Sequence, residues 1–360
     1  MWRTGHKRAR NRFDQAFGAI SIRVRLLTVP ATSITRTLTC YDIFNGDADG
    51  LCALRQLRLD DPRESQLVTG TKRDTALVAR IVPHAGDKLT VLDVSMDRNR
   101  DALLHALAAG ASCLYFDHHY PGAVPDHPRL ESHIRYVANV CTSLIVDEFL
   151  SGRHRAWAVA AAFGDNLPEE AQAAARSMRL DKEKVATLRT IGECLNYNAY
   201  GETEKDLHFP PAELYRRLAK FVDPIEFASR DPAFEALKLG YEQDMALAAT
   251  VDPLTDTVGG RVTVLPAEPW SRRVSGAWAN HMATSDPRRA HAVLVRQTQG
   301  YTVSVRAPLA RPSGADLLCR QFAQGGGRPA AAGINGLPEN ELQRFVTEFE
   351  RAYPDRVTSP

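Results

Sequence analysis

The chain has 360 residues, of which 44% are hydrophobic and 24% charged, a composition typical of a soluble globular protein with one or two domains. Its net charge of +2 gives no whole-chain signal for nucleic acid or membrane, so a nucleic-acid substrate would have to be held at a local site. Six scattered cysteines without a Cys-x-x-Cys pair argue against a disulfide framework and indicate reduced thiols. No run approaches the roughly 18 apolar residues of a membrane span, so we expect a cytoplasmic protein with no membrane partner.

Residues 1–39 form a basic leader, in which Lys and Arg greatly outnumber the acids. An Arg-rich, acid-poor leader is typical of an organelle transit peptide. The alternative is a disordered extension ahead of the first strand, and this is the interpretation we favour. The leader lacks the long apolar stretch of a secretory signal.

From Tyr41 onward, short apolar runs alternate with segments of helical spacing. We expect strands at 41–44, 66–69, 89–94, 113–116 and 134–138, and helices at 51–59, 71–82, 98–109 (capped by Asp97), 142–149 and 153–163. Alternation of this kind predicts an α/β fold with a Rossmann-like parallel sheet, whose ligand sites lie at the carboxyl ends of the strands.

The remaining chain divides into a helical stretch and a second α/β region. Residues 168–250 are expected to be largely helical, apart from a polar-aromatic loop at 195–202. Beyond residue 252 we expect strands at 261–265, 292–295 and 301–305, and helices at 274–282 and 315–322. The predicted organisation is a leader, a catalytic domain, a helical connector and a smaller C-terminal substrate-binding domain, at residues 1–39, 40–195, 196–251 and 252–355.

Acidic residues follow the ends of the predicted strands, and two histidines accompany the last of them. Carboxylate and imidazole donors together suit manganese, iron or zinc better than calcium. Two ions about 3.5–4 Å apart can clamp a phosphoryl group and activate a bridging water. The candidate ligands and neighbours are Asp47, Asp49, Asp93, Asp117, His118, His119 and Asp165.

These residues also admit other interpretations. The stretch 45–50 is similar to the start of an EF-hand loop, but Gln56 stands at its twelfth position where such a loop needs a Glu. Asp47 and Asp49 alone could be solvated turn acids, and His118 with His119 could be a structural pair. It is the joint occurrence of these residues that favours a metal site.

A glycine run near the C-terminus is a second candidate site. Gly325, Gly326 and Gly327 let a backbone approach a ligand closely, and bare amides can form an anion-binding concavity. Arg328 adds a planar fork suited to phosphate, and Arg306, at the end of a predicted strand, is a further candidate. The alternative is a flexible glycine hinge beside a surface arginine.

Taken together, the motifs resemble the DHH phosphoesterase superfamily, named for its Asp-His-His motif. Four ordered motifs carry the resemblance, and the glycine run resembles the motif of the family's C-terminal domain. The matching stretches are 47–50, 91–93, 117–119, 163–165 and 325–333. The resemblance implies a Rossmann-like domain and a smaller α/β domain with the active site in the cleft between them.

The resemblance also implies a two-manganese site, in which magnesium or another divalent metal is an alternative. Asp47 and Asp93 would bind one ion, and Asp49, Asp93, His118 and Asp165 the other. Asp117 would orient His118 or the nucleophilic water, and His119 would contact phosphate or assist the leaving group. The three glycines, Arg328 and Arg306 would hold the substrate.

Three positions depart from the family pattern. Ile43 stands where nano-RNase-like members have a metal-binding His, and Asn45 stands where RecJ-type exonucleases have an additional Asp. The first metal site is therefore expected to be weaker. Arg328 replaces the His of the usual Gly-Gly-Gly-His motif, which could retune substrate choice toward a more anionic group.

The sequence thus predicts a manganese-dependent phosphoesterase acting on small nucleotides or short single-stranded oligonucleotides, with homodimerisation as a further expectation. The near-neutral charge argues against processive cleavage of long DNA. Alternatives are a RecJ-like single-strand exonuclease, a polyphosphatase, and a non-catalytic nucleotide-binding sensor, which the Ile43 departure would favour.

Overall fold

The computed structural model describes residues 38–354. The predicted basic leader, residues 1–39, therefore lies almost wholly outside the described residues. Within those residues, no helix combines the length and the apolar character needed to cross a membrane.

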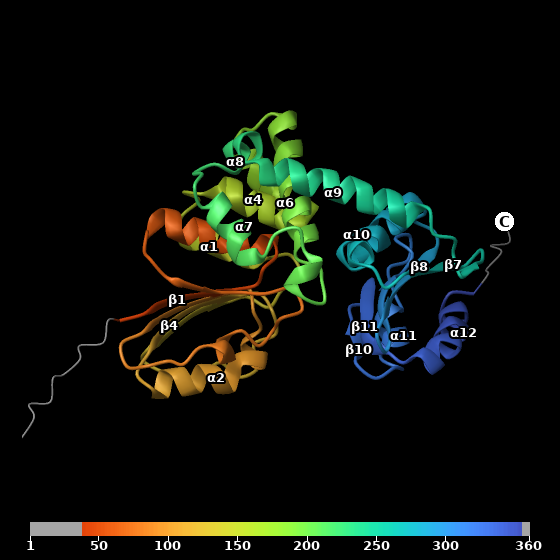
Figure 1. The fold of residues 1–360 in the computed structure, drawn as a ribbon, viewed down its shortest axis with the longest axis horizontal. Coiled ribbons are helices and arrows are strands. Elements are labelled where there is room, and N and C mark those ends of the chain that lie inside the picture. Colours follow the sequence, from red (N-terminus) through yellow and green to blue (C-terminus); the bar gives the residue numbers. More distant parts are fainter. Residues whose placement is uncertain (1–37, 355–360) are drawn as a thin grey trace, which may run out of the picture. The chain divides into compact units, whose positions relative to one another are not determined.

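The first sheet is built from five parallel strands in the order β2-β1-β3-β4-β5 (Figure 1). The strands are β1 (Cys40–Phe44), β2 (Gln66–Val68), β3 (Lys88–Leu92), β4 (Ser112–Asp117) and β5 (Leu130–Ile134). In the central register Ile43 pairs with Val91, and Val91 pairs with Tyr115. The strand order reverses direction between β1 and β3, which makes their carboxyl ends the switch point where ligands bind in such sheets.

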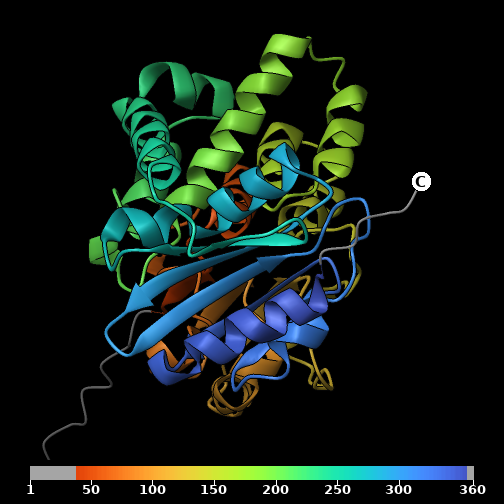
Figure 2. The same ribbon diagram turned by 90° about the vertical axis from the view of Figure 1, so that its right-hand side faces the viewer.

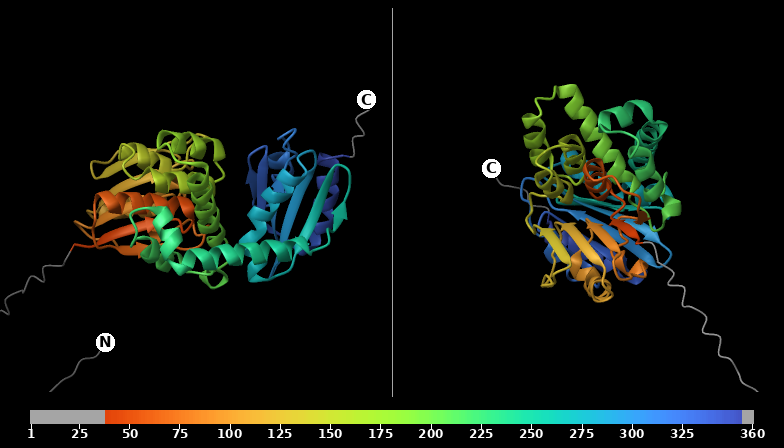
Figure 3. Two further views of the ribbon diagram at one scale, coloured as in Figure 1. Left: turned by 90° about the horizontal axis from the view of Figure 1, so that it is seen from above. Right: turned by 90° about the vertical axis from the view of Figure 1, so that its left-hand side faces the viewer.

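Each face of this sheet has its own apolar core, because the central strands are buried on both sides. On one face, Ile43, Val91 and Tyr115 pack with α2 (Met96–Ala108). On the other, Phe44 and Phe116 pack with α1 (Ala48–Asp60), α3 (Thr142–Phe149) and α4 (Arg155–Gly164). Figure 1 shows α2 below the sheet and α1 and α4 above it, and the right-hand view of Figure 3 shows the strands lying side by side. The parallel α/β prediction is confirmed.

A helical segment follows the first sheet. It comprises α5 (Pro168–Ser177), α6 (Lys182–Asn198), η2 (Glu204–Asp206), α7 (Pro211–Leu218), α8 (Pro224–Arg230) and α9 (Pro232–Ala249). Four of these helices carry proline in their first turn, where its missing N–H costs nothing. Backbone touches backbone where α4 meets α6, since a Cβ added to Gly192 would lie 1.9 Å from the carbonyl oxygen of Ala160.

The second sheet has six strands in the order β10-β11-β9-β8-β7-β6, with only β7 and β8 parallel (Figure 2). The strands are β6 (Thr255–Asp256), β7 (Gly260–Leu265), β8 (Ala290–Gln297), β9 (Gly300–Arg306), β10 (Gly325–Gly327) and β11 (Ala331–Leu337). One face packs against α10 (Pro269–Ser285), and the other against α11 (Ala315–Cys319) and α12 (Leu342–Ala352), which follows η3 (Glu339–Glu341).

A buried polar network connects α6, α9 and α10. The Nε of Arg273 donates to Asp244 Oδ2 at 2.7 Å and to the hydroxyl oxygen of Tyr197 at 3.1 Å. That hydroxyl in turn donates to Asp244. This network holds the start of α10 against α6 and α9, because separating Arg273 from Asp244 would leave a buried charge without a partner.

Two elements of the first sheet differ from the sequence predictions. The helix predicted at 71–82 is replaced by irregular chain and one short turn, η1 (Val78–Arg80). The amide of Lys72 donates to the Ala199 carbonyl at 2.9 Å, which holds the chain away from a helical path. The strand predicted at 134–138 lies four residues earlier, at Leu130–Ile134, and Ser95 rather than Asp97 precedes α2.

Further differences concern the later chain. The predicted loop at 195–202 begins inside α6, which continues to Asn198 because Leu195 and Tyr197 are buried. Gly325–Gly327 is not an open loop but an edge strand that pairs antiparallel with β11. The sequence analysis did not predict β11 or α12.

Candidate active site

Three of the predicted acids meet at the carboxyl edge of the first sheet. Asp47 follows β1, Asp93 follows the neighbouring β3, and Asp117 is the last residue of β4. All three are almost completely buried, with exposed fractions of 2%, 2% and 0%. Buried carboxylates are costly without partners, so each must be paired or bind a cation.

Asp47 caps the first helix. Its Oδ1 accepts the backbone N–H groups of Asp49 and Gly50 at 3.0 and 3.1 Å. Its Oδ2 accepts the ammonium of Lys72 at 2.5 Å. Burial alone would raise the pKa of Asp47, but Lys72 and the N–H donors lower the pKa to about 2.

Asp49 joins α1 to the N-terminus of α3. Its two carboxylate oxygens accept the backbone N–H groups of Thr142 and Ser143, both at 2.7 Å. These amides are among the unpaired donors of a helix N-terminus, which favours negative charge. Thr142 and Ser143 therefore orient Asp49 through their backbone amides, and they lie in the first turn of the helix predicted at 142–149.

Asp93 holds a backbone conformation that is rare for its residue type, with φ of 57°. Such strain of a non-glycine residue is concentrated at functional sites. The hydroxyl of Thr142 lies 3.3 Å from Asp93 Oδ1. Burial, and then the charges of Asp47 and Asp49, raise the pKa of Asp93 well above its ordinary range.

The two histidines of the Asp-His-His stretch have different partners. His118 Nδ1 lies 2.9 Å from the Val140 carbonyl oxygen, so Nδ1 carries the proton and Nε2 faces Asp93 at 3.4 Å. Burial would lower the pKa of His118, but Asp93 raises it to about 10. His119 Nδ1 lies 2.8 Å from Asp117 Oδ1, so Asp117 orients His119 and not His118.

Asp165 completes the group from the C-terminal end of α4. It lies 3.9 Å from His118 Nε2 through Oδ2, and 3.9 Å from Lys72 Nζ through Oδ1. Burial raises the pKa of Asp165 to about 6, against the attraction of Lys72.

The donor set fits a divalent metal ion. Among residues 38–354, ligand atoms of Asp49, His118 and Asp165 lie within 4.8 Å of one another, and so do those of Asp93, His118 and His119. In both sets burial raises a carboxyl pKa, that of Asp93 or of Asp165, with a further contribution from neighbouring carboxylates, and a bound cation would favour the charged form. Mixed carboxylate and imidazole ligands match manganese, iron or zinc.

A cavity of about 320 Å³ opens onto this group. Its lining includes the predicted residues Asp47, Asp93, His118, His119, Asp165 and Arg328. Asp49 and Asp117 lie behind the lining, since their exposed fractions are 1% and 0%.

Other predicted residues are not in that lining. Arg306 lines a different cavity of about 320 Å³ together with Tyr200 and Arg273, and its Nε donates to Asn280 Oδ1 at 2.6 Å. The lining of neither cavity includes Gly325, Gly326 or Gly327. The roles predicted for these four residues remain predictions.

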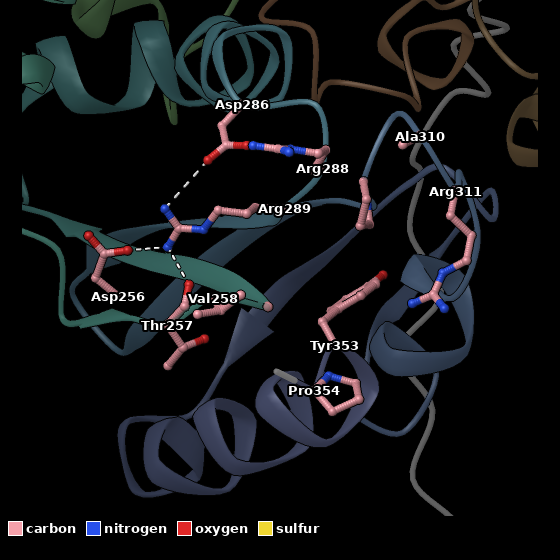
Figure 4. Close-up of a pocket in the computed structure, with 12 residues that line it drawn as sticks. Asp256, Thr257, Val258, Asp286, Arg288, Arg289, Ala310, Arg311, Tyr353 and Pro354 are labelled. Atoms are coloured by element: carbon pink, nitrogen blue, oxygen red, sulfur yellow. Dashed lines mark hydrogen bonds and ion pairs between the residues drawn. The ribbon is translucent and has the colours of Figure 1, made fainter. Parts of the chain in front are cut away.

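A larger cavity, about 760 Å³, is lined by the turn between β6 and β7, the connection from α10 to β8, the loop after β9 and the residues that follow α12 (Figure 4). Asp256 and Asp286 there pair with Arg289, while Arg288 and Arg311 extend from exposed positions. None of the predicted site residues lines it. Size alone therefore does not identify the site, and the buried acid cluster is the stronger candidate.

The sequence analysis missed Lys72, Asn196 and Tyr200. Lys72 follows β2, whose carboxyl end meets the same edge as those of β1 and β3. The strand-end argument applied to β2 would have found it. Asn196 and Tyr200 have no such signal, because the fold of a distant helix brings them to Lys72.

Comparison with known proteins relates the chain to others through structure. No family model matches the sequence, and no curated protein does either. The structure is similar to that of RecJ from Thermus thermophilus in complex with Mn²⁺, with a TM-score of 0.55 and 15% identity over 87% of this chain and 51% of that one. It is also similar to the pGpG-specific phosphodiesterase PggH from Vibrio cholerae, with a TM-score of 0.50 and 13% identity over 88% of this chain and 100% of that one.

These similarities define the fold class. The chain has the fold of the DHH phosphoesterases, as its motifs predicted. It spans about half the length of RecJ and the full length of PggH.

Proposed function

We propose that the protein hydrolyses phosphoester bonds in small nucleotides or short oligonucleotides in a reaction that depends on a divalent metal, manganese by preference. The observation that carries the proposal is the pair of ligand groups that share His118, one with Asp93 and His119 and the other with Asp49 and Asp165, at the carboxyl edge of the first sheet. The similarity to a manganese-bound RecJ and to a phosphodiesterase supports it.

Each residue of the site has a role in this proposal. A metal ion held by ligands from these two groups would supply an activated water and neutralise phosphoryl charge. His119 donates a proton to the leaving oxygen through its Nε2, because Asp117 fixes its Nδ1 and 45% of its side chain is exposed to the cavity. Lys72 and Arg328, which line the same cavity, bind phosphoryl oxygens.

A small substrate is favoured by the size of the cavity and by the low net charge of the chain. A cavity of about 320 Å³ is at the low end of the range for small-molecule sites. The net charge of +2 gives no basic track for a long strand. PggH, whose whole length this chain matches, is specific for the dinucleotide pGpG.

The second candidate is a RecJ-like single-strand exonuclease. The higher TM-score of the RecJ comparison and the absence of a His at position 43 favour it. A non-catalytic nucleotide-binding sensor is the alternative that is not an enzyme. A polyphosphatase, which would use the same site on polyphosphate, is the remaining enzymatic alternative.

The deciding experiment is product analysis in the presence of Mn²⁺. The full chain is given labelled pGpG, a ten-nucleotide single strand, phosphoadenosine phosphate and polyphosphate in parallel reactions. The Asp93→Asn variant, which removes one of the proposed metal ligands, serves as the inactive control. Asp97→Asn, on the exposed start of α2, serves as the matched active control.

We expect turnover of the dinucleotide or of phosphoadenosine phosphate that is lost in Asp93→Asn and retained in Asp97→Asn. Preference for the ten-nucleotide strand would establish the exonuclease alternative. Saturable nucleotide binding without any turnover would establish the sensor and refute the enzyme.

A further inference from the structure

The ammonium of Lys72 is a cation that the chain itself places among the acids. Its Nζ donates to Asp47 Oδ2 at 2.5 Å and to Asn196 Oδ1 at 3.1 Å, and lies 3.9 Å from Asp165 Oδ1. The ring of Tyr200 lies 5.5 Å from the same nitrogen, within the range of a cation–π contact. Four groups from three separate parts of the chain therefore surround one ammonium.

The backbone fixes Lys72 independently of its side chain. Its N–H donates to the Ala199 carbonyl at 2.9 Å, while the N–H of Thr71 donates to Asp74 Oδ2 at 2.9 Å. Gly70 allows this tight turn, since a Cβ there would lie 2.1 Å from Asp74 Oδ2. These contacts fix the backbone of Lys72, while Asp47, Asn196 and Tyr200 hold its ammonium.

The carboxylate of Asp47 is occupied by donors of the protein. Oδ1 accepts two backbone N–H groups, which use both of its lone pairs, and Oδ2 accepts Lys72. Ile43 is completely buried in an apolar cluster and offers no ligand atom. Neither ligand group within residues 38–354 includes Asp47.

We propose that the ammonium of Lys72 takes the place of one metal ion, so that the site holds a single divalent ion at Asp49, Asp93, His118 and Asp165 beside this built-in charge. The inference rests on the proposed function and replaces the two-ion count that the family resemblance implies. The side chain of Lys72 is 26% exposed and lines the cavity, so the ammonium reaches the substrate phosphate as well as Asp47.

The experiment counts the metal ions. Mn²⁺ is titrated into the metal-free full chain by calorimetry, and electron paramagnetic resonance at saturation reports whether two ions are coupled. The variants are Lys72→Met, which removes the charge, and Lys72→Arg, which keeps it. Lys184→Met is the matched control, because Lys184 also pairs with an aspartate, Asp181, at 3.7 Å on an exposed helix start.

We expect one uncoupled ion per chain in the wild type, in Lys72→Arg and in Lys184→Met. Lys72→Met is expected to bind a second ion and to show a coupled spectrum, because the charge that takes the place of that ion has been removed.

Two coupled ions in the wild type would overturn the inference while leaving the proposed function intact. One ion in a folded Lys72→Met would overturn it as well, because the ammonium would then not be what excludes the second ion. No ion in the wild type would refute the proposed function itself. The wild-type count decides the matter on its own if Lys72→Met does not fold.

Discussion

The two histidines of the site are distinguished by their hydrogen bonds, and under the proposed function this assigns metal binding to His118 and proton transfer to His119. His118 Nε2 points to Asp93, whereas His119 is held by Asp117 on its other nitrogen. We expect His119→Gln to lower kcat about 100-fold, the range for loss of a general acid, with Mn²⁺ affinity unchanged. His118→Gln should weaken Mn²⁺ binding as well. Calorimetry and steady-state kinetics on both variants test this, and equal loss of metal from the two would contradict the assignment.

The burial of His291 on β8 leads us to expect that the free energy of unfolding depends on pH. His291 is 2% exposed, its Nε2 lies 3.2 Å from the Asp286 carbonyl oxygen, and its Nδ1 has no hydrogen-bond partner among the described residues. Burial lowers the pKa of His291 below the ordinary 6.5. The unfolded chain therefore takes up this proton first as pH falls, so stability is complete above pH 6.5 and decreases below it, by at most about 1.4 kcal/mol per pH unit.

Thermal melts between pH 5 and 7.5 measure this dependence. The His291→Gln variant should show a shallower decrease in melting temperature toward acid than the wild type. His105→Gln, at an exposed position on α2, is the control and should follow the wild type. A slope unaffected by His291→Gln would show that other groups cause the acid sensitivity.

At the scale of elements, the contact between α4 and α6 determines the relative positions of two residues of the site. A Cβ on Gly192 would lie 1.9 Å from the Ala160 carbonyl oxygen, so these helices meet along bare backbone. α4 ends at Asp165, and α6 carries Asn196, which binds Lys72. A shift between the two helices would therefore move two groups of the site at once.

We expect Gly192→Ala to lower the free energy of unfolding by about 1–3 kcal/mol, as overpacking does, and to weaken Mn²⁺ binding severalfold. Gly326→Ala is the matched control, because a Cβ there meets no atom within 4 Å. Chemical denaturation and calorimetry give the two quantities. Destabilisation without any change in metal affinity would mean that the helix contact does not position the site.

Elements with strong local signals could be predicted from sequence. The apolar runs before Asp93 and Asp117, the first of them containing β-branched residues, indicated the central strands, and the parallel arrangement then brought the acids to one edge. The helix predicted at 71–82 was wrong, since a long-range bond from Lys72 to Ala199 overrides local propensity. β11 was missed because its alanines and glycines lack a strand pattern, and its pairing with β9 supplies the order.

The candidate site was predictable to a similar extent. Motif spacing indicated the candidate ligands, but it could not show that Asp117 pairs with His119 or that Asn196 reaches Lys72. Those contacts depend on χ angles and on residues more than a hundred positions apart, which a sequence pattern does not encode.

At the scale of the whole molecule, Arg328 tests whether the second sheet takes part in substrate binding. It follows β10 and lines the cavity of the acid cluster. We expect Arg328→Ala to raise KM about tenfold, which corresponds to the loss of one hydrogen bond to a charged group, and to leave Mn²⁺ binding unchanged. Arg320→Ala is the matched control, because Arg320 pairs with Asp316 and is 60% exposed. An unaltered KM in Arg328→Ala would exclude this arginine from recognition.

The hydrogen bonds of Asp49 have a consequence for how the protein would acquire the proposed metal ion. The carboxylate of Asp49 is oriented by the backbone amides of Thr142 and Ser143 at the start of α3, so its position is set by the fold itself. The ion would then bind to a protein that is already folded, unlike in a zinc finger, which folds only when its ion is bound. Chelation and reloading should be repeatable without refolding, with the melting temperature rising only by mass action as free Mn²⁺ increases. In a cell, such a protein could gain and lose its ion with the changing supply and remain intact throughout.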